Sequence, residues 1–200
     1  SYILDLMAKT PIKEIHLYDD DILQLHNAFR SPGAPSIEDL RGMPSKVNYY
    51  VRRYSEMREG LIPHEVRIDG TNLDELASME FVFVAIDGGE GKEELIKGLA
   101  GLEIPFADVG MGLYETEGSI GGHLRVTTCT PEQPDQRHIE LGGGGGDDVY
   151  DEDIQIADLN ALNATLAVIK WKKRRGFYSD FAHEQTSFYV VDTSSLINEA

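Results

Sequence analysis

The fold can be inferred from Leu17–Ala34, which reads LYDDDILQLHNAFRSPGA. The residues just before it, Glu14–Tyr18, alternate between polar and apolar side chains, which predicts a β-strand ending at Asp19. Open α/β sheets bind ligands at the carboxyl ends of their strands, so an acid at Asp19 is placed to accept both hydroxyls of a ribose. Asn27 and Arg30 follow in the next loop, where an amide and a planar cation suit a phosphate group.

The spacing D-x-D-x(5)-N-x-x-R after a strand resembles the ThiF/MoeB/HesA superfamily, the ATP-dependent adenylyltransferases that include the ubiquitin-activating enzymes. The superfamily pattern VDFDxVxxSNLxRQ lies over the chain from Tyr18 without a gap, and its arginine falls on Arg30. Two further matches come in the expected order, with Lys46 opening a helix and Asp87 ending a strand. The resemblance covers roughly residues 1–130 of the chain.

The resemblance implies that ATP and Mg²⁺ are the cofactors and that a carboxylate is adenylated. Cations and magnesium stabilise the charge that develops at the α-phosphorus and on the departing pyrophosphate, and the incoming carboxylate is itself the nucleophile. The residues implied for nucleotide binding are Asp19, Asp21, Asn27, Arg30 and Lys46. For Asp21 two interpretations stay open, a place near the metal and a solvated surface position.

Asp87 also has a case that does not depend on the resemblance. It follows the continuous apolar run Phe81–Ile86, which is typical of a central parallel strand, and precedes Gly88 and Gly89. A carboxylate at the carboxyl end of such a strand points into the ligand crevice, and a hard oxygen ligand suits magnesium. Asp87 is therefore the expected metal ligand and, with Arg30 and Lys46, one of three expected catalytic residues. The superfamily usually has Asp-Asn here, whereas this chain has Asp-Gly.

Composition limits the other possibilities. The hydrophobic share of 41% and the charged share of 26% are those of a soluble globular protein. The formal net charge of −17 argues against a nucleic-acid surface, which needs a basic stripe. A single cysteine, Cys129, excludes an internal disulfide and the Cys-x-x-Cys zinc pairs that the ThiF and MoeB branches often carry. No run reaches membrane length and nothing resembles a cleaved leader, so we expect a cytoplasmic protein without a membrane partner.

Strands alternate with helices in the first half of the chain, which predicts an α/β, Rossmann-like three-layer fold with a mainly parallel sheet and right-handed crossovers. We expect one domain over residues 1–200, with an antiparallel extension after Gly112. The expected helices are Ser1–Lys9, Ser36–Leu40 with Ser36 as its cap, Pro44–Glu59 ended by Gly60, a single turn capped by Asn72, Lys92–Leu99 and Asp153–Lys173. The expected strands are Glu14–Asp19, His64–Ile68, Phe81–Ile86, Pro105–Gly110, a hairpin of Leu113–Thr116 with Gly122–Thr128 turning over Gly118–Gly121, and Ser187–Asp192 at an edge.

In the superfamily a first strand and a glycine-rich phosphate loop precede the helix that starts here, and Ser1 would be the last residue of that loop. We therefore expect this chain to be a fragment that lacks both, and to bind ATP poorly and be inactive by itself, because backbone N–H groups of the loop should cradle the phosphates. The five-glycine run Gly142–Gly146 is expected to be a flexible loop or an engineered splice.

The resemblance implies that the carboxylate is the C-terminus of a ubiquitin-like or sulfur-carrier protein, and that the protein is a homodimer. Two other classes stay open, a Rossmann-type nicotinamide or flavin oxidoreductase and a non-catalytic dimerising scaffold. The oxidoreductase would explain Asp19 but leaves Asn27, Arg30 and Lys46 without a role. Cys129 has no nearby histidine to lower its pKa, so a structural thiol is expected rather than a thioester nucleophile. The basic run Lys170–Arg175 complements a helix terminus, with an anion site as the alternative.

Overall fold

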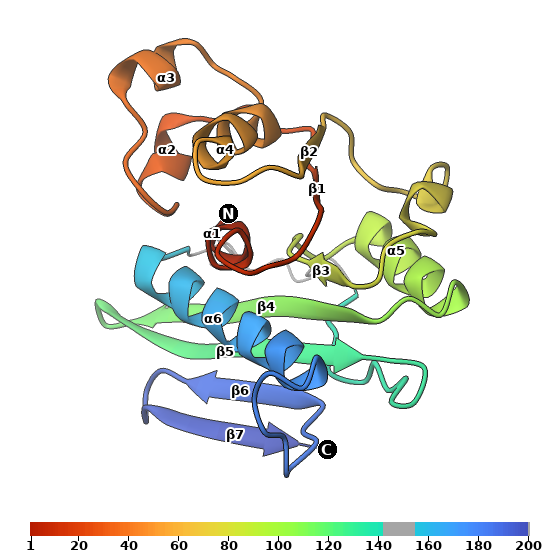
Figure 1. Cartoon of the computed structure of the whole chain (residues 1–200). Helices are drawn as coiled ribbons and strands as arrows, with labels where there is room; N and C mark the ends of the chain where they lie inside the picture. Colours follow the sequence, from red (N-terminus) through yellow and green to blue (C-terminus); the bar gives the residue numbers. More distant parts are fainter. Residues whose placement is uncertain (142–154, 200) are drawn as a thin grey trace. The chain divides into compact units, whose positions relative to one another are not determined.

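We describe a computed structural model of the chain over residues 1–141 and 155–199 (Figure 1). These residues form two compact units, Ser1–Ile68 with Ile156–Ala161, and Asp69–Gln155 with Leu162–Ala200. Each unit has its own sheet and is described in turn. None of the helices in the described ranges has the length and apolar character needed to span a lipid bilayer.

The first unit is a small parallel sheet covered by helices. Its elements are α1 (Tyr2–Met7), β1 (Ile15–Tyr18), α2 (Leu25–Ala28), α3 (Ile37–Arg41), α4 (Lys46–Ser55) and β2 (Leu61–His64). β1 and β2 pair in parallel, with Ile15 opposite Leu61 and Tyr18 opposite His64. The core is formed by Leu4, Leu23, Tyr49 and Tyr50, with Ile15, Leu17, Leu40, Tyr54 and Leu61 packed against them. The expected helix at residues 1–9 and the strand ending before Asp19 are confirmed.

Local sequence explains where these elements begin and end. Ser36 caps α3, because its hydroxyl accepts the Asp39 N–H while the Asp39 carboxylate accepts the Ser36 N–H, as expected for a capping box. α4 ends at Ser55, four residues earlier than expected. Gly60 follows with φ of 76°, and a Cβ there would lie 2.1 Å from the carbonyl oxygen of Lys13. Glycine therefore lets the chain turn into β2 beside β1.

The second unit contains a five-stranded mixed sheet in the order β3-β4-β5-β6-β7. Its strands are β3 (Val82–Val84), β4 (Phe106–Thr116), β5 (Ser119–Cys129), β6 (Thr186–Val190) and β7 (Ser195–Glu199), and its helices are the 3-10 turn η1 (Leu73–Leu76), α5 (Glu90–Gly101) and most of α6 (Ala157–Arg174). β3 and β4 are parallel, and the other neighbours are antiparallel. The expected fold class, α/β with parallel strands and an antiparallel extension, is confirmed.

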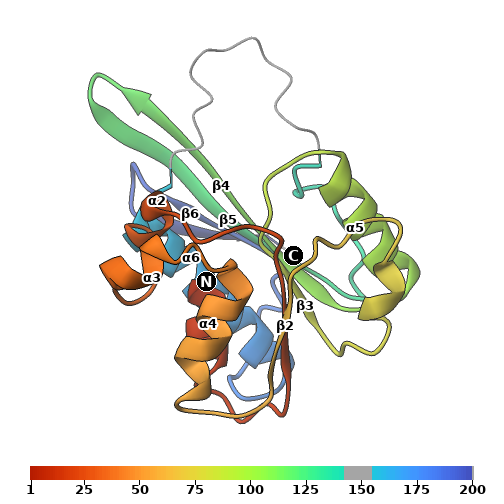
Figure 2. The same cartoon turned by 90° about the horizontal axis from the view of Figure 1, so that it is seen from above.

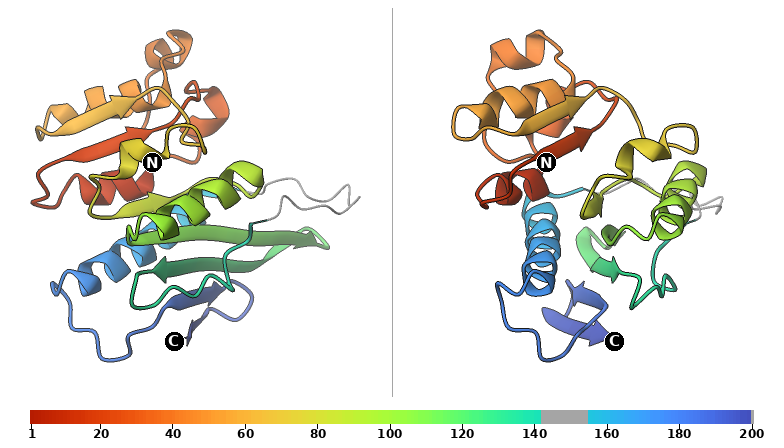
Figure 3. Two further views of the ribbon diagram at one scale, coloured as in Figure 1. Left: turned by 90° about the vertical axis from the view of Figure 1, so that its right-hand side faces the viewer. Right: turned by 45° about the vertical axis from the view of Figure 1, so that its right-hand side comes forward.

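Helices α5 and α6 cover opposite faces of this sheet (Figures 2 and 3). On one face, Lys92 of α5 contacts Asp108 of β4. On the other, α6 packs through a stripe that includes the buried residues Ala164, Ala167 and Val168. Successive side chains of a strand point to opposite faces, so Asp108 and its neighbour Ala107 belong to different sides of the sheet.

A buried ion cluster lies under α5. Asp108 is fully buried, and its two carboxylate oxygens lie 2.8 Å from Lys92 Nζ and 2.8 Å from Arg125 Nη2. Gly110 makes the arginine's position possible, because a Cβ there would lie 2.3 Å from Arg125 Nη2. The Arg125 guanidinium also donates to Thr127 Oγ1 at 3.3 Å. One buried carboxylate therefore contacts two buried cations, a pairing that lowers the cost of burying these charges.

Several expected strands have different bounds. The strand expected over His64–Ile68 is wrong, because β2 ends at His64 and contains Pro63, which is tolerated at the edge of a two-stranded sheet. The strand expected over Phe81–Ile86 is shorter, and β3 is the edge of its sheet rather than a central strand. Ile86, the last residue of the expected strand, lies beyond the end of β3 and is exposed.

The antiparallel part of the sheet is larger than expected. The segments expected at Pro105–Gly110 and Leu113–Thr116 form the single strand β4. The glycines do not break the strand, because Gly110 and Gly112 leave room for the side chains of Arg125 and His123 on β5. The hairpin turn consists of Glu117 and Gly118 alone. β6 is an interior strand, and β7, which was not expected, forms the edge.

Two expectations concern single residues or segments. Asn72 was expected to cap the turn η1, but its Oδ1 accepts the Asp69 N–H at 2.8 Å and η1 has no side-chain cap. The glycine run Gly142–Gly146 and the expected start of the last helix at Asp153 lie outside the described residues.

Candidate functional site

The acidic loop after β1, which contains Asp19, Asp20 and Asp21, is hydrogen-bonded to the start of α4. The backbone N–H of Leu23 donates to the Pro44 carbonyl at 2.9 Å, and the N–H of Lys46 donates to the Asp21 carbonyl at 2.9 Å. Ser45 caps α4 by accepting the Asn48 N–H. These backbone contacts bring Lys46, the first residue of α4, beside the aspartates that follow β1.

The side chain of Lys46 joins two of those aspartates. Its Nζ lies 2.5 Å from Asp21 Oδ2 and 3.8 Å from Asp19 Oδ2. Asp19 in turn accepts the Asp21 N–H through Oδ1 at 2.8 Å. The hydrogen bond from Lys46 is the main reason that the pKa of Asp21 lies below its usual range, with the charges of Lys46, Arg67 and His26 acting in the same direction. The Lys46 side chain is 22% exposed.

Asn27 is buried, and its side chain supports the short helix α2. Its Oδ1 accepts the Gln24 N–H at 2.9 Å, and the Gln24 side chain accepts the Asn27 N–H, which makes a reciprocal capping box. The Asn27 oxygen is therefore already engaged, and its amide Nδ2 is the group left for a ligand. Arg30 follows α2 and is half-buried.

These residues surround one cavity of about 230 Å³. Four of the residues implicated by the sequence line it: Asp21, Asn27, Arg30 and Lys46. The first unit thus brings together two cations, one carboxylate and one amide from three segments of the chain. The cavity is below the range of about 300–1,000 Å³ typical of ligand pockets.

Sequence reasoning did not identify the other residues that line this cavity, Ile22, Gln24 and His26. They lie between the aspartates and Asn27, in the loop and in α2. The superfamily pattern is variable at the positions of Ile22 and Gln24 and has serine at that of His26. The capping role of Gln24, with Asn27 three residues later, was a signal that the sequence did contain.

Asp87 belongs to the second unit and is described with it. It lies three residues after the last residue of β3 and three before the first residue of α5, and it is exposed. Its position at the carboxyl end of a strand that is parallel to its neighbour agrees with the place expected from the sequence.

Asp19, Asp20 and Asp21 each offer a carboxylate oxygen within 4.8 Å of the others. All three acids are paired with cations, since Lys46 contacts Asp21 and Asp19, and Arg67 Nε lies 3.3 Å from Asp20 Oδ1. Oxygen ligands of this kind suit magnesium, but exposed acids adjacent in sequence often lie this close without binding a metal.

Cys129 has the environment of a structural thiol. It is buried at the end of β5, its Sγ donates to the Asp135 carbonyl at 3.4 Å, and burial raises its pKa to about 12. A thiol in that state carries almost no thiolate at neutral pH, and the thiolate is the nucleophilic form. This geometry agrees with the expectation that Cys129 is not a thioester nucleophile.

No protein-family model matches the sequence, and no curated protein is significantly similar to it. Solved structures do match. PaaA superposes with a TM-score of 0.71 at 14% identity, covering 99% of this chain and 68% of PaaA. E. coli MccB in complex with MccA superposes with a TM-score of 0.72 at 17% identity, covering 99% of this chain and 59% of MccB. MccB crystallised with ATP gives 0.69 at 16% identity.

The chain thus spans 58–68% of the length of the structures it matches. Identities of this size establish the fold and nothing finer. One of the MccB structures is described as that of a microcin C7 biosynthetic enzyme. Over nearly its whole length, therefore, this chain has the fold of MccB and PaaA.

Proposed function

We propose that the protein is an ATP-dependent adenylyltransferase that activates a carboxylate. The observation that carries this proposal is the gathering of Asp21, Asn27, Arg30 and Lys46 around one cavity, with Asp19 next to it. The fold adds support, because MccB, which has the same fold, has been crystallised with ATP.

In this proposal Arg30 and Lys46 bind the phosphates of ATP, and Asp19 accepts the ribose hydroxyls. Lys46 exchanges its contact with Asp21 for a phosphate oxygen, and its fixed backbone position keeps it at that place when it does so. Asn27 contributes its Nδ2 group, since its oxygen is engaged within α2. Proteins usually stabilise a phosphoryl transition state with cations that are already in position before the charge develops.

Adenylation itself requires only a displacement at phosphorus. An oxygen of the substrate carboxylate bonds to the α-phosphorus, and the bond to the pyrophosphate oxygen breaks. Magnesium would neutralise the phosphate charge, and we propose Asp87 as its ligand. Arg30, Lys46 and Asp87 are then the catalytic residues, and no protein nucleophile takes part.

The proposed substrate is the C-terminal carboxylate of a small protein or peptide, of the ubiquitin-like or sulfur-carrier kind. Complexes of MccB with MccA agree with a partner of this general class. A homodimer in the cytoplasm is part of the same proposal and rests on the family resemblance.

The test is ATP–pyrophosphate exchange by the intact protein, with and without candidate peptides that end in a free carboxylate. We expect Lys46→Met to lower the exchange rate by about 10²–10³-fold, as loss of one transition-state donor does in other enzymes. Lys13→Met is the matched control in the same unit, because Lys13 is 92% exposed and pairs only with Glu14 among the described residues. Equal exchange by the Lys46 and Lys13 variants would contradict the proposal.

A further inference from the structure

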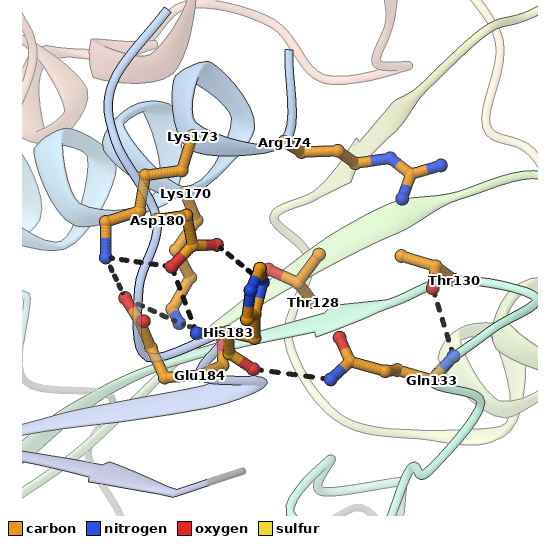
Figure 4. A pocket seen from close by; sticks show the side chains of 9 residues that line it. All are labelled: Thr128, Thr130, Gln133, Lys170, Lys173, Arg174, Asp180, His183 and Glu184. Atoms are coloured by element: carbon orange, nitrogen blue, oxygen red, sulfur yellow. Dashed lines mark hydrogen bonds and ion pairs between the residues drawn. The ribbon is translucent and has the colours of Figure 1, made fainter. Parts of the chain in front are cut away.

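The second unit contains a cavity of its own, of about 270 Å³, formed by the end of β5, the end of α6 and the loop that leads into β6 (Figure 4). The residues that matter for its chemistry are Thr128, Lys170, Lys173, Arg174, Asp180 and Glu184. In a chain with a net charge of −17, three cations converging on one cavity are unusual.

This cavity is separate from the position of Asp87. Thr128 pairs with Ala107 near the start of β4, whereas Asp87 follows the carboxyl end of β3, the parallel neighbour of β4. Thr128 and Ala107 also lie on the face of the sheet covered by α6, opposite the ion cluster around Asp108. The proposed adenylation assigns no role to the residues that line this cavity.

Lys170 supplies buried hydrogen-bond donors. The residue is 6% exposed, and its Nζ donates to the Glu184 carbonyl at 2.9 Å. The Glu184 carboxylate lies 3.8 Å from Nζ, beyond hydrogen-bond distance. An ammonium has three N–H donors, so two remain without an acceptor among residues 1–141 and 155–199. Burial lowers the Lys170 pKa to about 8, which leaves the group mostly charged at neutral pH.

The residues that line the cavity include three cations, Lys170, Lys173 and Arg174, and two carboxylates, Asp180 and Glu184. Lys173 is occupied by two acids, since it contacts the Glu184 carboxylate and lies 3.7 Å from Asp180 Oδ1. Arg174 is 3.8 Å from its nearest acid, Glu132, which is itself 74% exposed. Lys170 and Arg174 are therefore both available to an anion. The partial negative charge at the end of α6 opposes an anion, but it is smaller than the charge of two cations.

Two further polar atoms are buried without hydrogen-bond partners in the described structure: Thr128 Oγ1 and Glu184 Oε2. A hydroxyl can donate to an anion. Burial raises the pKa of Glu184, but the hydrogen bond from Lys173 and the charges of Lys170 and Lys173 outweigh burial, so the pKa is lowered overall and the carboxylate is ionised. An ionised carboxylate only accepts, and it therefore requires a donor on whatever fills the cavity.

We propose that this cavity binds an oxyanion that also carries a hydrogen-bond donor, of the hydrogen-phosphate class. Lys170, Arg174 and the Thr128 hydroxyl donate to its oxygens, and its P–OH group donates to Glu184. Sulfate has the same shape but no proton at neutral pH, so Glu184 would repel it. Inorganic phosphate keeps a P–OH group at pH 7, whereas a phosphomonoester, whose second pKa is about 6, is mostly a dianion without one.

The experiment is calorimetric titration of the intact protein at pH 7 and low ionic strength with phosphate, with sulfate, and with glycerol phosphate as the monoester. We expect phosphate to saturate the site and sulfate to bind at least tenfold more weakly. Glycerol phosphate, which mostly lacks a P–OH group at pH 7, should also bind more weakly than inorganic phosphate, and equal or tighter binding would contradict the proposed donation to Glu184. Lys170→Gln and the half-exposed Arg174→Gln should each weaken binding by about tenfold or more, because each removes a charged hydrogen bond.

Lys172→Gln is the matched control, since it removes the same charge from the same helix but its ammonium lies over the rings of Phe177 and Tyr178. A Lys46→Met protein must bind phosphate as the wild type does, which separates this site from the proposed nucleotide site. No saturable binding, equal affinity for sulfate, or equal loss in the Lys172 control would each overturn the proposal.

Discussion

Replacing Asp108 by asparagine should destabilise the second unit more than any other single removal of a charge. The substitution keeps the shape of the side chain but leaves Lys92 and Arg125, which are 3% and 2% exposed, without a counter-charge. Breaking a buried ion pair by removing one partner costs about 3–5 kcal/mol. In a chain of this length that corresponds to a fall in Tm of roughly 10 °C.

The assay is urea unfolding followed by the fluorescence of Trp171, the single tryptophan, which lies in α6 within the second unit. Asp135→Asn is the control, because its ion pair with Arg137 is exposed and should contribute little to stability. A loss of less than 1 kcal/mol for Asp108→Asn would refute the reasoning, since it would mean that the two cations reach solvent or are not both charged in the folded protein.

Three further outcomes are expected. Burial lowers the pKa of Lys170 to about 8, so the folded state binds fewer protons than the unfolded state between that value and the usual pKa of about 10.4. Stability relative to Lys170→Met should therefore rise by about 2 kcal/mol between pH 8 and pH 10 in phosphate-free buffer, and a flat difference would contradict the burial of the ammonium. Cys129, whose pKa is raised to about 12, should react with iodoacetamide at neutral pH only in denaturant, and rapid labelling of the folded protein would show an accessible thiol. Tyr54→Phe should cost about 1 kcal/mol, because the hydroxyl donates to Asp5 Oδ1 at 2.9 Å, and an unchanged urea midpoint would show that this bond contributes nothing.

The sequence was informative where a local pattern determines the structure. The strand before Asp19 and the capping box at Ser36 depend on residues within a few positions of one another, and both are confirmed. One motif and the lysine that opens a helix together predict a shared site for four residues. These four line one cavity: Asp21, Asn27, Arg30 and Lys46. Whether they bind ATP remains a prediction.

What the sequence missed depends on contacts between distant segments. The apolar run around β3 was taken for a central strand, because hydrophobicity does not tell which strands are neighbours. Gly110 is at the end of an expected strand, but in the structure it lies within β4. Its lack of a side chain leaves room there for Arg125 of β5. The cavity at the end of α6 combines residues from positions 128 to 184, which no short motif connects.

The central claim is that Arg30 and Lys46 hold the phosphates of ATP, and the most direct measurement is the dissociation constant of MgATP for the intact protein and for its Arg30→Gln variant. Arg30 lines the cavity with Lys46 but, among the described residues, makes no ion pair that its loss would disturb. We expect saturable binding by the wild type and a dissociation constant about 10–150-fold higher for the variant, since a hydrogen bond to a charged group contributes about 1.5–3 kcal/mol. An unchanged constant in Arg30→Gln, or a wild-type protein that binds NAD but not ATP, would contradict the account.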